Sequence, residues 1–166
     1  MRNAFPLLFL LLFWNAGAQY KTLRDAFVLE MPINGTQSFK MEVPQKPYFV
    51  TDGALQLYPF EKLFLEVEIK KDTIFAMHVV SQNLNPKNTI EIELMQQSHN
   101  GLHENMTLSI KNPFKKPLVY TAEIYTFARR KWTPTSIMPV APKSSGFEIW
   151  NDAILTMVLS DWAFED

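Results

Sequence analysis

The sequence predicts an all-β fold, an antiparallel β-sandwich of about 8–10 short strands. Residues 63–70 alternate apolar with mainly charged side chains, the pattern of a strand with one face on a core and one in water. Turn dipeptides such as Asn-Gly, Asp-Gly and Asn-Pro separate short apolar stretches along the chain. No glycine-rich phosphate loop and no strand-helix-strand rhythm appears. These observations favour a sandwich over an α/β fold.

Residues 89–111 predict the central β-hairpin of this sandwich. A two-residue turn at Asn100-Gly101 would set the apolar side of each strand against the polar side of the other. We therefore expect a three-residue loop, His99 to Gly101, with the glycine at a positive-φ bulge position. That register pairs Ile90 with Ile110, Ile92 with Leu108, and Leu94 with Met106.

The same test predicts two hairpins before residue 60. A loop of residues 33–35 would pair Leu29 with Phe39 and Phe27 with Met41. Asp52-Gly53 fits a two-residue turn, and it would pair Val50 with Leu55 and Tyr48 with Leu57.

The second half of the chain continues the strand pattern. Residues 112–117 form an expected loop, residues 118–127 a strand, and residues 134–146 an extended, proline-rich connection. Residues 153–164 have the composition of a strand but also apolar residues at helical spacing, so both remain open. The stretch TLSIKNPFKKPLVY at residues 107–120 resembles the strand, Asn-Pro loop and strand of immunoglobulin-like and fibronectin-like sandwiches. The resemblance implies an immunoglobulin-like arrangement, with a jelly-roll-like one as the alternative, and it implies no activity.

Residues 1–18 are expected to be a cleaved signal peptide. Arg2 precedes an apolar run over residues 4–14, and Ala16-Gly17-Ala18 has the small-residue pattern of a cleavage site. The ending resembles the signal peptides of Gram-negative bacteria, which implies a secreted or periplasmic protein cleaved between Ala18 and Gln19. Residues 19–166 would then form a single domain. The chain has no cysteine, so the sequence predicts neither disulfides nor a cysteine-linked lipid anchor.

Charge and motifs exclude several classes of function. The chain carries 16 basic and 17 acidic residues, without the basic stripe of a nucleic-acid-binding protein. His99 and His103 are four residues apart, but the further ligands of a metal site are missing nearby, so no metal and no cofactor is expected. His78 stands alone and is expected on a sheet face.

Two carboxylate pairs, Glu66 with Glu68 and Glu91 with Glu93, could hold calcium or cleave a glycosidic bond. They also suit the solvated face of a sheet, which is the interpretation we favour. With no cysteine nucleophile and no G-x-S-x-G motif, the sequence disfavours an enzyme.

The candidate ligand site is the basic, aromatic loop Arg129, Arg130, Lys131 and Trp132. An exposed tryptophan could stack on a sugar while arginines bind a carboxylate or sulfate. The alternative is that the basic run is a solvated loop while Trp150 and Trp162 fill the core.

Three functions are therefore considered. The first is a non-enzymatic interaction or structural module that binds an envelope protein. The second is a carbohydrate- or small-ligand-binding module that uses the Arg129–Trp132 loop. The third is a small outer-membrane β-barrel, which proline-rich connections and strand glutamates disfavour.

Overall fold

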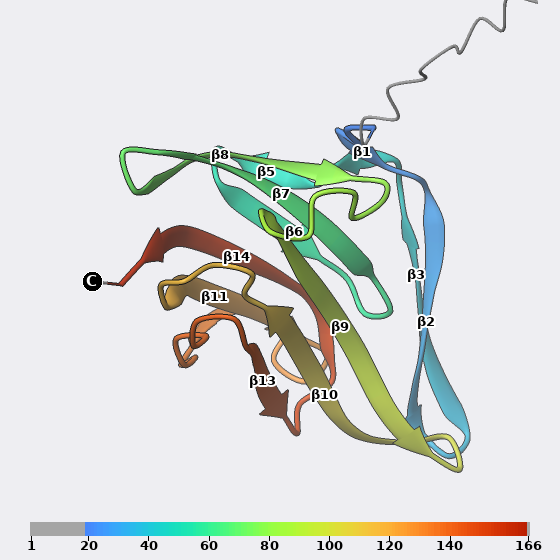
Figure 1. Ribbon diagram of the computed structural model, residues 1–166. Coiled ribbons are helices and arrows are strands. Elements are labelled where there is room, and N and C mark those ends of the chain that lie inside the picture. The colour runs from blue at the N-terminus through green and yellow to red at the C-terminus, as the bar shows by residue number, and fades with distance from the viewer. Residues whose placement is uncertain (1–18, 166) are drawn as a thin grey trace, which may run out of the picture.

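The computed structural model describes residues 19–165, and in this range the fold is all-β, as predicted. The expected signal peptide lies outside the described residues. Strand pairs along the chain are antiparallel, and two five-stranded sheets face each other as a sandwich (Figure 1). The part of the chain described contains no helix long and apolar enough to cross a membrane.

The strands fall into two large sheets and two short pairs. The first sheet has, in spatial order, β13 (Ser145–Trp150), β10 (Leu102–Lys111), β9 (Thr89–His99), β7 (Lys62–Lys70) and β8 (Thr73–Val80). The second sheet has β12 (Trp132–Thr135), β11 (Leu118–Thr126), β14 (Ile154–Phe164), β6 (Ala54–Leu57) and β5 (Phe49–Thr51). The short pairs are β2 (Phe27–Asn34) with β3 (Gln37–Val43), and β1 (Leu23–Arg24) with β4 (Lys46–Pro47).

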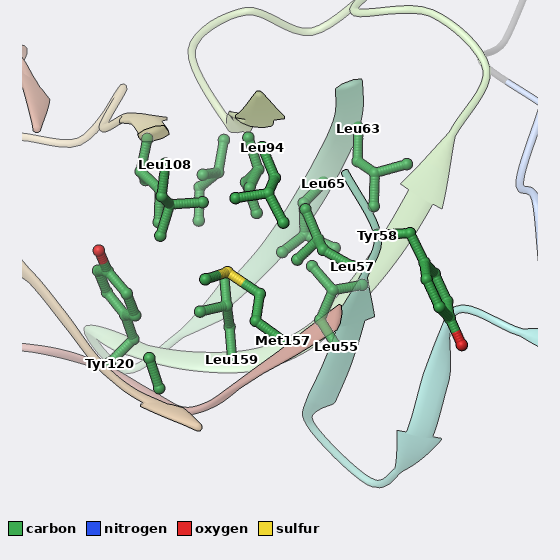
Figure 2. Close-up of a cluster of buried hydrophobic side chains, with 14 of the residues drawn as sticks. Leu55, Leu57, Tyr58, Leu63, Leu65, Leu94, Leu108, Tyr120, Met157 and Leu159 are labelled. Atoms are coloured by element: carbon green, nitrogen blue, oxygen red, sulfur yellow. The ribbon is translucent and has the colours of Figure 1, made fainter. Parts of the chain in front are cut away.

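The core lies between the inner faces of the two sheets. Figure 2 shows β6 and β14 of the second sheet facing β7, β9 and β10 of the first, with the labelled leucines, Met157 and Tyr120 between them. Burying each such side chain stabilises the fold by about 1.5–3 kcal/mol. Apolar burial on this scale accounts for a sandwich that has no disulfide.

The central hairpin has the predicted apolar face but not the predicted register. Its turn is the two-residue Asn100-Gly101, with both φ angles positive, at 49° and 75°. Both angles fit a type I′ turn. Glu104 is an extra residue between paired His103 and Asn105, and this β-bulge restores the parity that the short turn alone would break. The pairs are therefore Ile92 with Ile110 and Leu94 with Leu108, shifted by two residues from the prediction.

The other two predicted registers also fail because of bulges, which keep the predicted parity between β2 and β3 and reverse it between β5 and β6. In the β2–β3 hairpin the turn is Gly35-Thr36 and Ile33 is the bulge. The pairs are Leu29 with Met41 and Phe27 with Val43. Between β5 and β6 the turn is Asp52-Gly53, as predicted, but a bulge at Val50 pairs Phe49 with Leu55.

The β2–β3 hairpin lies beside the tip of the β9–β10 hairpin (Figure 1). Gln96 of β9 joins the two, since its Nε2 donates to the backbone oxygen of Pro32 at 2.8 Å. A Cβ added to Gly101 would lie 3.4 Å from the backbone of Gly35, an ordinary contact, so it is the positive φ of 75° that favours glycine here.

The segment that the sequence left open, residues 153–164, is a strand. It forms β14, which lies between β11 and β6 inside the second sheet and has Met157 and Leu159 fully buried. An interior strand satisfies its backbone on both sides, so the helical spacing of a few apolar residues does not decide its structure.

Candidate functional site

A groove crosses the outer face of the second sheet. Its volume is about 560 Å³, and we call it the cross-strand groove. Its lining comes from all five strands and the β5–β6 turn: Val50, Thr51, Asp52, Ala54, Gln56, Glu123, Trp132, Val158, Ser160 and Asp161. Strands about 4.8 Å apart give such a groove a length of roughly 19 Å. It can therefore accommodate an extended ligand.

Trp132 forms one wall of the cross-strand groove. It begins β12, the edge strand, and pairs with Tyr125 of β11. The two rings pack edge to face, with centroids 5.6 Å apart, while 43% of Trp132 remains exposed. Tyr125 thus fixes an indole that still offers a flat apolar surface to a ligand.

Gln56 places an amide in the groove. It faces Val158 across β6 and β14, and the residue is only 6% exposed. Its Nε2 donates to Thr156 Oγ1 at 3.0 Å, which fixes the orientation of the amide. Its Oε1 has no hydrogen-bond partner within the described chain. A buried acceptor without a donor is costly, but this oxygen has almost no accessible surface and is therefore not open to a ligand in the groove.

Asp161 owes its position to a β-bulge. Asp161 and Trp162 together oppose Tyr120, and the backbone of Asp161 has a positive φ of 54°. The bulge turns Trp162 into the core, where its ring stacks on Tyr120. The Asp161 carboxylate stays outside and accepts hydrogen bonds from Thr121 Oγ1 at 2.6 Å and Ser160 Oγ at 3.3 Å.

The charges along the groove all have one sign. Asp52, Glu123 and Asp161 line it, and no lysine or arginine is among its lining residues. Carboxylates accept hydrogen bonds, so the groove is rich in acceptors. Such a lining suits a ligand that carries many donors and no negative charge.

Of the four residues predicted as a ligand site, the structure places only Trp132 in the groove. Arg129 forms an ion pair with Asp152 at 3.6 Å. Arg130 has a positive φ of 52°, and it lies with Lys131 on the exposed loop before β12. The basic part of the loop is therefore solvated, in line with the alternative interpretation.

The two tryptophans that were expected in the core are buried to different extents. Trp162 is 8% exposed, whereas Trp150 is half-buried against the core and donates through Nε1 to Thr135 Oγ1 at 2.8 Å.

The histidines and paired carboxylates have structural contacts. His103 contacts Gln96 Nε2 through Nδ1 at 2.8 Å and the backbone oxygen of Asn151 through Nε2 at 3.0 Å. These distances fit a ring protonated on Nε2. Among residues 19–165, no three side chains of metal-ligating type gather at one place.

The glutamates lie mainly on the first sheet's outer face, as a solvated sheet requires. Glu91 bonds Lys111 at 2.9 Å, and this hydrogen bond lowers the pKa of Glu91 below its usual value. Glu66 accepts from Asn85 at 3.1 Å, and Glu68 lies 3.3 Å from His78.

Comparison with models of protein families, with curated proteins and with solved structures finds no match to this chain.

Sequence reasoning missed Gln56, Glu123 and Asp161 as site residues. Gln56 is a polar residue between two leucines, which marks a polar face but not a groove. Glu123 has the same kind of signal in its strand. No local sequence pattern predicts the bulge that positions Asp161.

Proposed function

We propose that this protein is a secreted or periplasmic binding module that holds a neutral carbohydrate chain in the cross-strand groove. The observation that carries the proposal is a groove touched by every strand of one sheet, with an exposed indole wall and carboxylates along its lining. Ligand sites combine apolar surface with a few fixed polar groups that orient the ligand. Trp132 supplies the apolar surface, and Glu123 and Asp161 supply the polar groups.

The chemistry of a sugar fits this lining. A sugar ring has an apolar face that can cover the indole of Trp132, and its hydroxyl groups donate hydrogen bonds at the ring edge. The acceptors available are the carboxylates of Asp52, Glu123 and Asp161. The groove thus offers an apolar surface for the face of a sugar ring and hydrogen-bond acceptors for its hydroxyl groups.

The direction of the groove favours a glycan over a peptide. An extended peptide usually adds to the edge of a sheet, where its backbone can join the ladder. A chain that crosses the strands of a sheet face finds the backbone groups already paired, so it must be recognised by side chains alone. Side-chain recognition of this kind suits a ligand with hydroxyl groups along its length.

The charge of the groove favours a neutral glycan. Three carboxylates would repel uronic acids or sulfated sugars, and the exposed Arg130 and Lys131 are not among the lining residues. This differs from the sequence-based expectation that arginines of the loop would bind an anionic group.

Affinity electrophoresis in native gels tests the proposal. Gels would contain soluble neutral glucan, mannan or xylan, or the polyanion alginate. We expect a neutral polysaccharide to retard the wild-type protein and alginate not to. Trp132→Ala should weaken retardation about tenfold or more, because aromatic anchors dominate such contacts. Phe147→Ala is the matched control, since it removes a 65% exposed aromatic residue outside the groove.

Two results would count against the glycan. Absence of retardation in every neutral gel would remove the proposal, as would equal retardation of Trp132→Ala and wild type. Binding of a lysine-rich peptide that Trp132→Ala abolishes would instead assign the acidic groove to a basic partner.

A separate observation favours the protein-interaction hypothesis. Phe147 and Ile149 project from the same face of the edge strand β13, and each is 65% exposed. Adjacent exposed apolar side chains on a sheet edge are typical of a contact with another protein. In-cell crosslinking of the tagged chain should recover an envelope protein. Replacing both residues by serine should abolish this crosslink, whereas an unchanged crosslink would argue against this surface.

A further inference from the structure

A second hollow adjoins the cross-strand groove at one end of the second sheet. Its volume is about 500 Å³, and we call it the end pocket. It lies between the β5–β6 turn of the second sheet and β8, the edge strand of the first sheet. Thr51, Asp52 and Asp161 line both hollows, and all three residues are exposed. The groove and the end pocket therefore meet at side chains that a ligand can reach.

The path from the groove into the end pocket turns a corner. The groove lies on the outer face of the second sheet, whereas the end pocket is lined by Trp162, which is buried in the core, and by residues of β8 in the opposite sheet. Figure 1 shows β5 and β8 at the same end of the sandwich. Packed sheets are about 10 Å apart. A chain that fills both hollows must therefore leave the sheet face and bend towards the other sheet.

Phe75 gives the end pocket an exposed aromatic side chain. It belongs to β8, lines the pocket and is 61% exposed. Lys70 Nζ lies 3.2 Å from the centroid of the Phe75 ring, and this cation–π contact holds the ring in place. Trp132 is held by Tyr125 in a similar way. Each hollow thus has one fixed and exposed aromatic side chain.

Three β-bulges position side chains along this path. Val50 is the extra residue of β5 against β6, and Phe75 is the extra residue of β8 against β7. Asp161 belongs to the bulge of β14 against β11. Bulges interrupt the regular alternation of a strand and so re-aim a side chain, and they are common beside binding sites. Bulges in three strands of two sheets therefore place lining residues of the two hollows.

The charge of the end pocket matches that of the groove. Asp52 and Asp161 are its carboxylates, and its lining residues in the described chain include no lysine or arginine. His78 also lines the pocket, and its Nε2 lies 3.3 Å from Glu68 Oε1. A neutral chain with many hydroxyl groups therefore finds acceptors and an aromatic contact in both hollows.

We propose that the end pocket extends the glycan site, so that the protein binds a flexible neutral polysaccharide chain that passes from Trp132 around the β5–β6 turn to Phe75. This inference rests on the proposed function of the groove. Hydroxyl groups at the corner donate to Asp52 and Asp161, and a sugar ring beyond the corner packs against Phe75. A chain fixed in the flat surface of a crystalline polysaccharide cannot follow the corner, so the ligand is a single soluble chain.

Calorimetric titration of the mature protein with trisaccharides and octasaccharides from soluble glucan, mannan and xylan tests the proposal. A trisaccharide is short enough to lie in the groove alone, whereas an octasaccharide can reach both hollows. For the polysaccharide that retards the protein in gels, the octasaccharide should bind about tenfold or more tighter than the trisaccharide. Phe75→Ala should remove most of that gain and leave the trisaccharide affinity unchanged. Trp132→Ala should weaken both, and Phe147→Ala, outside both hollows, should weaken neither.

The variant separates this extension from the groove itself. A longer chain also gains affinity because it can bind in more registers, but that gain is the same in wild type and Phe75→Ala. Absence of binding by every oligosaccharide would remove the proposed function and the extension with it. Trisaccharide binding together with equal octasaccharide affinity in wild type and Phe75→Ala would overturn the extension alone.

Two further results would also overturn the extension. An equal loss of both affinities in Phe75→Ala would place the effect of Phe75 in the groove and not beyond the corner. Retention of the protein on microcrystalline cellulose that Phe75→Ala abolishes would show that Phe75 binds a flat surface and not a bent chain.

Discussion

Replacing Asn112 by alanine should strongly destabilise the sandwich. Asn112 directly follows β10, is 1% exposed, and joins two loops that are far apart in sequence. Its Nδ2 lies 2.9 Å from the oxygens of Lys116 and Val140 and 3.2 Å from that of Ala141. Its Oδ1 accepts the backbone N–H of Phe114 at 2.8 Å. One amide thus organises both the β10–β11 loop and the segment before β13.

The expected loss of stability depends on which hydrogen bonds remain for the backbone groups that Asn112 contacts. The Val140 oxygen still accepts from Leu118 N, whereas the Phe114 N–H loses its acceptor in a buried place. Leaving one buried donor unpaired costs about 1–3 kcal/mol, and the lost bonds to the carbonyls add about 1 kcal/mol each where water cannot replace them. We therefore expect a total of about 2–4 kcal/mol. In a chain of this size that corresponds to a melting temperature lower by about 4–16 °C.

Urea and thermal unfolding followed by circular dichroism measure this loss. Asn88→Ala is the matched control, because its exposed side chain makes no hydrogen bond within the described chain, and it should stay within about 0.5 kcal/mol of wild type. The urea m-value should not change. A loss below about 1 kcal/mol for Asn112→Ala would refute the view that this amide joins the two loops.

Three further predictions concern charge. Burial, with a smaller effect from Glu148, raises the pKa of Tyr120, so its hydroxyl keeps its proton to higher pH in the folded state than in the unfolded state. Stability should therefore fall as the pH rises above about 10. Tyr120→Phe should flatten that fall in alkaline urea titrations, and an unchanged slope would contradict the prediction. Lys111 lowers the pKa of Glu91, so the stabilising effect of the Glu91 carboxylate is present at neutral pH and lost on acidification below about pH 4.3. Lys111→Met should therefore lose less stability in acid than the wild type does. An equal acid slope in the wild type and the variant would exclude the link between Lys111 and Glu91. Replacing the buried Arg24 alone by methionine should cost about 3–5 kcal/mol of stability, because it leaves the Glu61 carboxylate unpaired. Replacing Glu61 by leucine as well should recover part of this loss. Additive losses in the double-mutant cycle would show that Arg24 and Glu61 are not coupled.

The parity of two of the three predicted hairpins could be derived from the sequence, but none of the three registers could. Alternation fixes which side chains share a face, and the face that carries Ile92, Leu94 and Leu108 was predicted correctly. An odd residue can be placed in the turn or as a bulge within a strand, and both give the same parity. The chain places the odd residue in bulges at Ile33 and Glu104, whereas the bulge at Val50 reverses the parity predicted for β5 and β6. Each choice depends on contacts with neighbouring strands, which local sequence does not contain.

The candidate site was predictable only in its aromatic part. An exposed Trp132 beside a basic run is visible as a surface candidate, but the run itself contributes nothing to the groove lining. The acceptors come from the β5–β6 turn, β11 and β14, which are distant in sequence and brought together only in the folded sheet.

The indole N–H signals in an NMR titration with a neutral polysaccharide fragment test the central claim most directly. Three tryptophans of the described chain report separately: Trp132 in the groove, Trp150 bonded to Thr135, and Trp162 in the core. The proposed function predicts a saturable shift that is largest at Trp132, with Trp150 and Trp162 nearly unmoved. No shift at Trp132 with any neutral glycan, or a larger shift at Trp150, would contradict a carbohydrate site in the cross-strand groove.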